Sequence, residues 1–310
     1  MSEIGADPMS KDFRRYGAIE GGGTKFVVLT GSDPDHIDRL EQIETTTPQK
    51  TLQRCIDFLV EEHRRSALAA VGIGMFGPVD LRKGSSTYGY VTTTPKLLWQ
   101  FTDIVGPLQQ ALGIPIGWEN DVNAAVLGEA RYGAGRSCDP LVYLTVGTGV
   151  GGGVYVGGRV LHGLLHPEMG HVLMPSVPGD DFEGACPFHG RCLEGLVSGP
   201  AIEARCRRPA SMVPMDDPAW GIVAEYLGAA LMDISLILSP ERIVLGGGVI
   251  ADGWLLPKIR EVLVRRLQSY LAHALLGERV DEYVVSSALG GRAGVIGALA
   301  VAREAAEAEG

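Results

Sequence analysis

Two glycine-rich turns constrain the fold of this chain more than any other feature. Residues 21–25 separate apolar runs at 16–20 and 26–30, and residues 147–153 follow an apolar run at 141–146. Short apolar runs joined by a glycine turn predict β-hairpins. Each predicted hairpin is followed by segments with helical spacing, and strands that alternate with helices indicate an α/β fold. The second half opens in the same way as the first, which indicates an internal duplication.

The 310 residues are enough for two domains, and no change of composition marks a linker between them. We therefore expect two lobes packed around a cleft. The predicted organisation is a disordered leader at 1–14, an N-terminal lobe at 15–123, and a C-terminal lobe at 124–291. A final helix at about 292–308 is expected to pack back on the first lobe. The expected helices are 48–65, 101–112, 121–131, 219–238, 255–275 and 292–308, and the further strands are 69–75, 115–118, 242–245 and 283–286.

The charge balance limits the classes of partner. The 27 basic and 37 acidic residues give a net charge of −10, and no run of Lys or Arg occurs, so nucleic-acid binding is not expected. An anionic ligand would have to meet local N–H groups, helix ends or a metal. The N-terminus lacks an apolar signal core and the five cysteines form no regular framework, so we expect no membrane association and a cytoplasmic location.

The glycine turns are candidate phosphate sites. The turn from Gly147 has the letters of a dinucleotide fingerprint, but a strand pattern follows it instead of the required helix. No Walker A spacing is present either. Backbone N–H groups in glycine hairpins can bind phosphate oxygens, and a third turn at Gly246, Gly247 and Gly248 could pack against a nucleotide. The alternative is that all three are only tight turns.

A Cys/His cluster is predicted to bind a metal. His171, Cys186, His189 and Cys192 follow one another at offsets of 15, 3 and 3, and two thiols with two imidazoles favour zinc. The zinc-binding loop would thus span 171–192. The alternative is a set of core cysteines and solvated histidines.

One carboxylate is a candidate general base. Asp121 follows an apolar strand, precedes a helix, and stands beside amides that could bind further hydroxyls. A carboxylate so placed can orient and deprotonate a hydroxyl group. The alternative is that Asn120 or Asp121 only caps the helix.

Taken together, these motifs resemble the ROK sugar kinases and repressors from about residue 16 onward. The resemblance rests on Ile19-Glu-Gly-Gly-Gly-Thr-Lys25, Glu119-Asn-Asp-Val-Asn-Ala124, the turn after Leu144, Glu168-Met-Gly-His171 and the segment from Cys186 to Glu194. Residues 76–80, 88–95 and 166–171 are similar to the bacterial ROK fructokinases.

The resemblance implies an actin-like ATPase (ribonuclease H-like) fold, with ATP, Mg²⁺ and sugar in the cleft, Zn²⁺ in the Cys/His loop, and a homodimer. It implies that Asp121 is the general base and that His171 both contacts sugar and binds zinc. The implied sugar contacts are Asn120, Glu168, His171 and Glu194. The implied nucleotide contacts are Gly22, Gly23, Thr24, Lys25, Thr145, Thr148, Gly149, Gly246, Gly247 and Gly248. Glucose-phosphorylating relatives have aspartate near the magnesium where this chain has Glu20.

The expected activity is phosphoryl transfer from ATP to a hexose, with fructose as substrate and fructose 6-phosphate as product. Glucose, mannose or an N-acetylhexosamine are alternative substrates. A sugar-sensing repressor would need a DNA-binding domain, and only about fifteen residues precede the first strand. A zinc hydrolase, the third class, would turn over without ATP.

Overall fold

A computed structural model describes residues 14–309 of the chain, so the leader expected at 1–14 lies almost wholly outside the described residues. The chain divides into two compact units. The first unit extends to Glu119 and includes the chain from Ala298 onward, and the second unit is Asn120–Gly297. The final helix α9 (Ala293–Ala308) therefore begins in the second unit and ends in the first.

The first unit contains a five-stranded sheet. Its strands follow the order β3 (His36–Glu44), β2 (Lys25–Asp33), β1 (Arg15–Gly21), β4 (Leu68–Met75) and β7 (Ile116–Asn120). β1 and β2 form the predicted antiparallel hairpin, and β4 lies parallel to β1. Strand β3 was not expected from the sequence, because its largely exposed, charged residues lack an apolar run.

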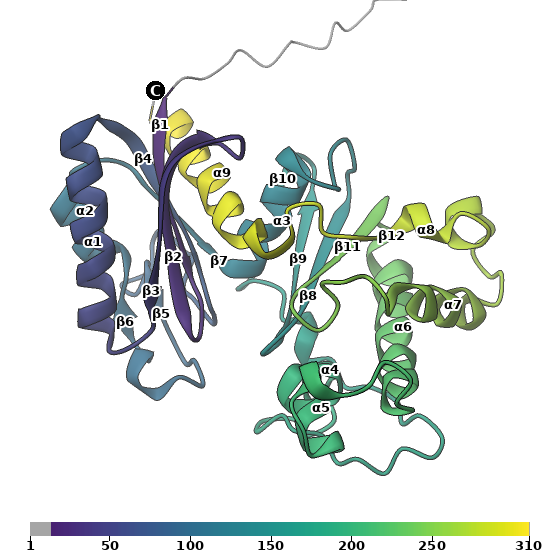
Figure 1. The fold of residues 1–310 in the computed structure, drawn as a ribbon. Coiled ribbons are helices and arrows are strands. Elements are labelled where there is room, and N and C mark those ends of the chain that lie inside the picture. Colours follow the sequence, from purple (N-terminus) through teal and green to yellow (C-terminus); the bar gives the residue numbers. More distant parts are fainter. Residues whose placement is uncertain (1–13, 310) are drawn as a thin grey trace, which may run out of the picture. The chain divides into compact units, whose positions relative to one another are not determined.

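Helices cover both faces of this sheet. α1 (Pro48–Arg65) and α2 (Val105–Leu112) lie on one face, and α9 lies on the other (Figure 1). Thr47 is the N-cap of α1 as expected, although its side chain makes no capping bond. The apolar core includes Ile19, Phe26, Leu59, Ile73 and Trp99.

Two helix boundaries predicted from apolar spacing were wrong. The helix expected from residue 101 begins at Val105, because Phe101 has a positive φ of 52° and β6 (Thr102–Asp103) pairs with β5 (Tyr90–Val91). The helix expected up to residue 275 is α7 (Leu256–Leu267), which ends where Gln268 adopts a left-handed conformation. A left-handed residue and a strand pair therefore delay the start of α2, and a left-handed residue ends α7, although the apolar spacing extends further in both cases.

The second unit repeats the strand order of the first. Its sheet runs β10 (Arg159–Val160), β9 (Val150–Val156), β8 (Leu141–Val146), β11 (Arg242–Gly246) and β12 (Val284–Ser286). β8 and β9 form the second predicted hairpin, and β11 lies parallel to β8. The remaining elements are η1 (Leu97–Trp99), η2 (Met169–His171), α4 (Leu193–Val197), α5 (Gly199–Cys206), η3 (Ala210–Met212), η4 (Ala274–Leu276), α8 (Val280–Tyr283) and η5 (Gly290–Arg292).

Helix α3 (Asp121–Tyr132) lies on one face of this sheet, and α6 (Ala219–Leu238) and α7 lie on the other (Figure 1). Within residues 14–309, α6 is the one helix long and apolar enough to cross a membrane by length and composition. Its buried residues, including Val223, Leu227 and Leu231, belong to the core of the second unit. The apolar character of α6 thus has a packing explanation.

Glycine allows α9 to lie directly on the first sheet. A Cβ atom on Gly72 of β4 would lie 1.9 Å from the carbonyl oxygen of Ala298 and 2.4 Å from the amide nitrogen of Ala302. Both are backbone atoms, so they cannot swing aside. Any side chain at residue 72 must push the helix off the sheet.

We expect Gly72→Ala to lower the free energy of unfolding by about 1–3 kcal/mol, the usual cost of overpacking a core. Gly84→Ala is the matched control, because a Cβ there meets no atom within 4 Å. Urea denaturation of both variants measures the difference. Equal stabilities would contradict the close contact between β4 and α9.

Candidate functional site

Asp121 is the first residue of helix α3, so its carboxylate lies at the N-terminus of the helix. Asn120 caps this helix, because its side-chain oxygen accepts a 2.7 Å hydrogen bond from the backbone N–H of Asn123. Oδ1 of Asp121 accepts from the N–H of Val122 at 2.9 Å. A helix N-terminus favours negative charge, so the carboxylate is held where its ionised form is stabilised. The predicted cap and the predicted base are thus neighbouring residues with different contacts.

Two further carboxylates, those of Glu168 and Glu194, belong to the same region of the second unit as Asp121. The pKa of Glu168 is raised to about 7, first by desolvation and then by the negative charges of Asp121 and Glu194. His166 Nδ1 lies 3.4 Å from Oε1 of Glu168. The structure therefore brings three of the predicted site carboxylates close enough to interact. Such a cluster can accept hydrogen bonds from several hydroxyl groups.

The four predicted metal ligands also come together in the second unit. Their ligand atoms all lie within 4.8 Å of one another. Nδ1 of His171 is 3.8 Å from Sγ of Cys186 and 3.6 Å from Sγ of Cys192, and Nδ1 of His189 is 3.8 Å from Sγ of Cys186. Sulfur and nitrogen ligands of a tetrahedral zinc ion lie roughly 3.5 Å apart. The donor set and its spacing fit zinc.

The thiols of the cluster would have to lose their protons when a metal binds. Burial raises the pKa of the Cys192 thiol to about 11, so without a cation this group would stay protonated at neutral pH. Zinc binds the deprotonated thiolate, whose charge it would neutralise in this buried place. Because Nδ1 of His171 faces the thiols, its Nε2 is the nitrogen left for another partner.

Glu194 links this cluster to the second glycine hairpin. It follows Cys192, which caps helix α4 by accepting from the N–H of Gly195 at 3.4 Å. Oε2 of Glu194 accepts a 3.0 Å hydrogen bond from the N–H of Val150 at the tip of the β8–β9 hairpin. A Cβ on Gly149 would lie 2.7 Å from that same oxygen. The absence of a side chain at Gly149 therefore lets the carboxylate reach the hairpin backbone.

A cavity of about 700 Å³ lies beside this hairpin in the second unit. Thr148 and Gly248, both predicted nucleotide contacts, line it. Thr145, Gly149, Gly246 and Gly247 are not among its lining residues, which are Gly147, Thr148, Gly199, Pro200, Glu203, Ala210, Ser211, Val213, Met215, Trp220, Gly248, Val249, Asp252 and Trp254. The volume suits a drug-sized ligand.

Several residues of this cavity were not found from the sequence. Trp220 and Trp254 meet edge to face with ring centroids 5.1 Å apart, and Glu203 and Asp252 add carboxylates to the wall. These side chains come from segments without a recognisable motif. Of the lining residues, only Thr148 on the hairpin and Gly248, two residues after strand β11, were predicted as contacts from the sequence.

The hairpin of the first unit carries the remaining predicted phosphate contacts. Gly22 closes the turn by donating to the carbonyl of Lys25 at 3.0 Å, and Gly23, Thr24 and Lys25 are exposed. The ammonium of Lys25, however, donates to Oε1 of Gln42 on β3 at 3.4 Å. The backbone of the turn is therefore open to a ligand, whereas the lysine of the motif is directed to the neighbouring strand.

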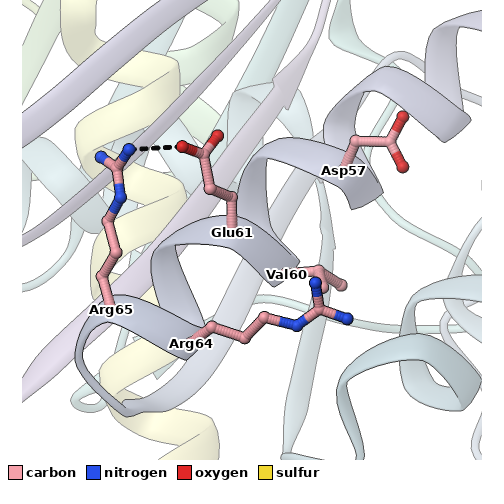
Figure 2. Close-up of a pocket in the computed structure, with 5 residues that line it drawn as sticks. All are labelled: Asp57, Val60, Glu61, Arg64 and Arg65. Carbon is pink, nitrogen blue, oxygen red and sulfur yellow. Dashed lines mark hydrogen bonds and ion pairs between the residues drawn. The ribbon is translucent and has the colours of Figure 1, made fainter.

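A further hollow lies on the surface of α1. Figure 2 shows that all five residues lining it, Asp57, Val60, Glu61, Arg64 and Arg65, belong to this one helix. Arg65 is paired with Glu61, and Arg64 points away from that pair (Figure 2). No chemistry-bearing groups from separate elements converge there, so we do not regard this hollow as a candidate site.

Known proteins are similar to this chain over nearly its whole length. The model of the ROK family matches residues 16–305. The chain is 41% identical to a fructokinase of Zymomonas mobilis subsp. mobilis, over 95% of this chain and 98% of that protein. It is 38% identical to a fructokinase of Pediococcus pentosaceus, over 93% of this chain and 98% of that protein.

Among solved structures, a ROK family glucokinase from Streptomyces griseus, in complex with glucose and AMPPNP, matches with a TM-score of 0.75. The identity is 26%, and the match covers 94% of this chain and 99% of the glucokinase. The predicted α/β class and actin-like ATPase fold are thereby confirmed.

The cap at Asn120 gives the first test of this site. We expect Asn120→Ala to lower the free energy of unfolding by about 0.5–2 kcal/mol, because the N–H of Asn123 loses its acceptor. Asn120→Ser is the matched control, since it loses the same amide donor but keeps a capping oxygen. Denaturant titration gives the free energy of unfolding of each variant, and the difference between them measures the contribution of the capping hydrogen bond. Equal free energies would show that this bond does not stabilise the protein.

Proposed function

This chain belongs to the ROK family, and from that premise we propose that it is an ATP-dependent fructokinase that converts fructose to fructose 6-phosphate. The observation that carries the proposal is the carboxylate cluster around Asp121, in a chain 41% identical to a fructokinase over nearly its whole length. Glucose, mannose and N-acetylhexosamines are the alternative substrates, because one epimeric hydroxyl can change specificity strongly.

In the proposed reaction, Asp121 acts as general base. The P–O bond between the terminal phosphorus and the β-phosphate breaks, and a P–O bond to the 6-hydroxyl oxygen of the sugar forms. The hydroxyl proton passes to the Asp121 carboxylate and then to water, and ADP leaves. Asn120, Glu168, Nε2 of His171 and Glu194 hold the other hydroxyls, which fixes the angle of attack.

The nucleotide is proposed to use the glycine turns of both units. Thr145, Thr148 and Gly149 on one hairpin and Gly22, Gly23 and Thr24 on the other supply N–H and hydroxyl donors for phosphate oxygens. The cavity beside Gly246–Gly248, with its two tryptophans, would take the adenosine. Magnesium, when bound to ATP, neutralises phosphate charge, and Glu20 is the carboxylate nearest the first glycine turn in sequence.

We propose a structural role for zinc at His171, Cys186, His189 and Cys192. Four protein ligands complete a tetrahedral ion and leave no position for an activated water, which argues against a zinc hydrolase. His171 would then join the metal to the sugar through its two ring nitrogens. A cytoplasmic location, a homodimer, and the lack of nucleic-acid or membrane partners complete the proposal, and the acidic net charge of −10 supports the absence of nucleic acid.

The base is tested by Asp121→Asn. This change keeps the shape of the side chain and removes its basicity, so we expect kcat for fructose to fall by about 10²–10⁴. Steady-state ATP consumption across a panel of hexoses provides the measurement, with Asp57→Asn on α1 as control. A parent rate in Asp121→Asn would exclude this base, and a panel in which fructose is among the poorest substrates would exclude fructokinase activity.

The metal is tested by Cys186→Ser. We expect this variant to lose about one zinc per chain and to unfold at a lower temperature, because the thiolate ligand is gone. Metal analysis and thermal unfolding, both independent of activity, provide the measurements. Cys206→Ser is the control, since Cys206 lies in the same unit outside the cluster. Equal zinc contents in the two variants would contradict the proposed ligand set.

A further inference from the structure

The ammonium group of Lys96 lies at the tip of the glycine hairpin in the first unit. A Cβ atom on Gly23 would lie 2.4 Å from Nζ of Lys96, so the ammonium lies directly against the backbone of this glycine. The same Nζ is 5.2 Å from the centre of the Phe76 ring, a cation–π distance. Two independent contacts therefore fix where this charge is held.

Aromatic packing holds the backbone that carries Lys96. Trp99, in the turn directly after Lys96, stacks on Phe26 at 5.1 Å and meets Phe76 edge-on at 5.6 Å. Its indole N–H donates to the carbonyl of Thr46, and its backbone N–H donates to the carbonyl of Lys96. Through these contacts the segment is fixed against strand β2 and Phe76, the residue after β4, and Lys96 needs no large rearrangement to reach the hairpin.

Phe76 also ties this packing to the glycine turn itself. Its backbone N–H donates to the carbonyl of Gly21 at 3.1 Å, so the residue whose ring contacts Lys96 is hydrogen-bonded to the first residue of the turn. The hairpin tip, the end of β4 and the segment around Lys96 thus form one packed corner of the first unit.

The donors at this corner are available to an anion. Within residues 14–309, Lys96 forms no ion pair, and the backbone N–H groups of Gly23 and Thr24 have no acceptor. Lys25, the lysine of the glycine motif, is instead hydrogen-bonded to Gln42. An ammonium beside two open N–H groups is suited to phosphate oxygens.

We propose that Lys96, rather than Lys25, binds the terminal phosphate of the nucleotide at this hairpin and stabilises the charge of the phosphoryl group during its transfer. This inference rests on the proposed kinase function. The terminal phosphate carries about two negative charges at neutral pH, more than either inner phosphate, and so gains most from a single ammonium. Lys96 keeps its proton throughout, because the hydroxyl proton passes to Asp121.

The test compares Lys96→Met, Lys96→Arg and the exposed-loop control Lys83→Met. Methionine keeps an unbranched stem against Phe76 but removes the charge, so we expect an unchanged unfolding temperature and a fall in kcat of about 10²-fold. Lys96→Arg should restore part of the rate. Calorimetry without sugar should show that Lys96→Met weakens AMPPNP binding more than ADP binding, while fructose binding without nucleotide is unchanged.

Lys83→Met should match the parent protein in every measurement. The proposal is overturned if Lys96→Met keeps the parent kcat and the parent ratio of AMPPNP to ADP affinity, or if Lys25→Met shows these losses in its place. The nucleotide measurements separate this inference from the substrate proposal. If the parent protein does not phosphorylate fructose but Lys96→Met still loses AMPPNP selectively, the fructokinase proposal fails and the role of Lys96 stands.

Discussion

The position of Asp121 depends on how closely helix α3 packs on its neighbours in the second unit. A Cβ on Gly297 of α9 would lie 1.9 Å from the carbonyl oxygen of Ala124, and a Cβ on Gly153 of β9 would lie 2.5 Å from that of Val122. Backbone therefore meets backbone on two sides of α3. At its C-terminal end, the fully buried Glu129 accepts from the N–H of Ala134 at 2.6 Å. The proposed base would have to be held to within about half an ångström, and close packing of backbone on backbone restrains α3.

Local patterns predicted the parts of the fold that depend on local rules. The hairpins and the starts of α1 and α3 depend on turn glycines, on proline at the first helical position, and on a cap, all visible in short stretches of sequence. The close backbone approaches at Gly72 and Gly297 depend on tertiary packing and are not visible in short stretches of sequence. Strand β3 was not predicted, because it is an exposed edge strand and its sequence therefore lacks the apolar run that marks a buried strand.

Those parts of the candidate site whose residues lie at short, regular spacings in the sequence could be predicted. The four Cys/His ligands converge because offsets of 15, 3 and 3 bring them onto one short region. Lys96 could not be found in this way. It is far from the glycine turn in sequence, and only the packing of Trp99 and Phe76 brings it there. The sequence motif predicts Lys25 as a phosphate contact, and this stays a prediction. The motif does not show that the Lys25 side chain reaches Gln42, because side-chain orientation depends on tertiary packing.

The two units differ in the charge they would present to a substrate. In the second unit, desolvation, followed by the negative charges of Asp121 and Glu194, raises the pKa of Glu168 to about 7. Such a cluster accepts hydrogen bonds from a neutral polyol but repels a phosphate. In the first unit, the ammonium of Lys96 and the open N–H groups of the hairpin are donors suited to phosphate oxygens. They cannot accept hydrogen bonds from the hydroxyl groups of a sugar. Because the chain as a whole carries −10, phosphate binding cannot come from net charge and must come from local donors. Under the proposed function, the acceptors around Asp121 would serve the neutral sugar, and the donors of the glycine turns would serve the anionic nucleotide.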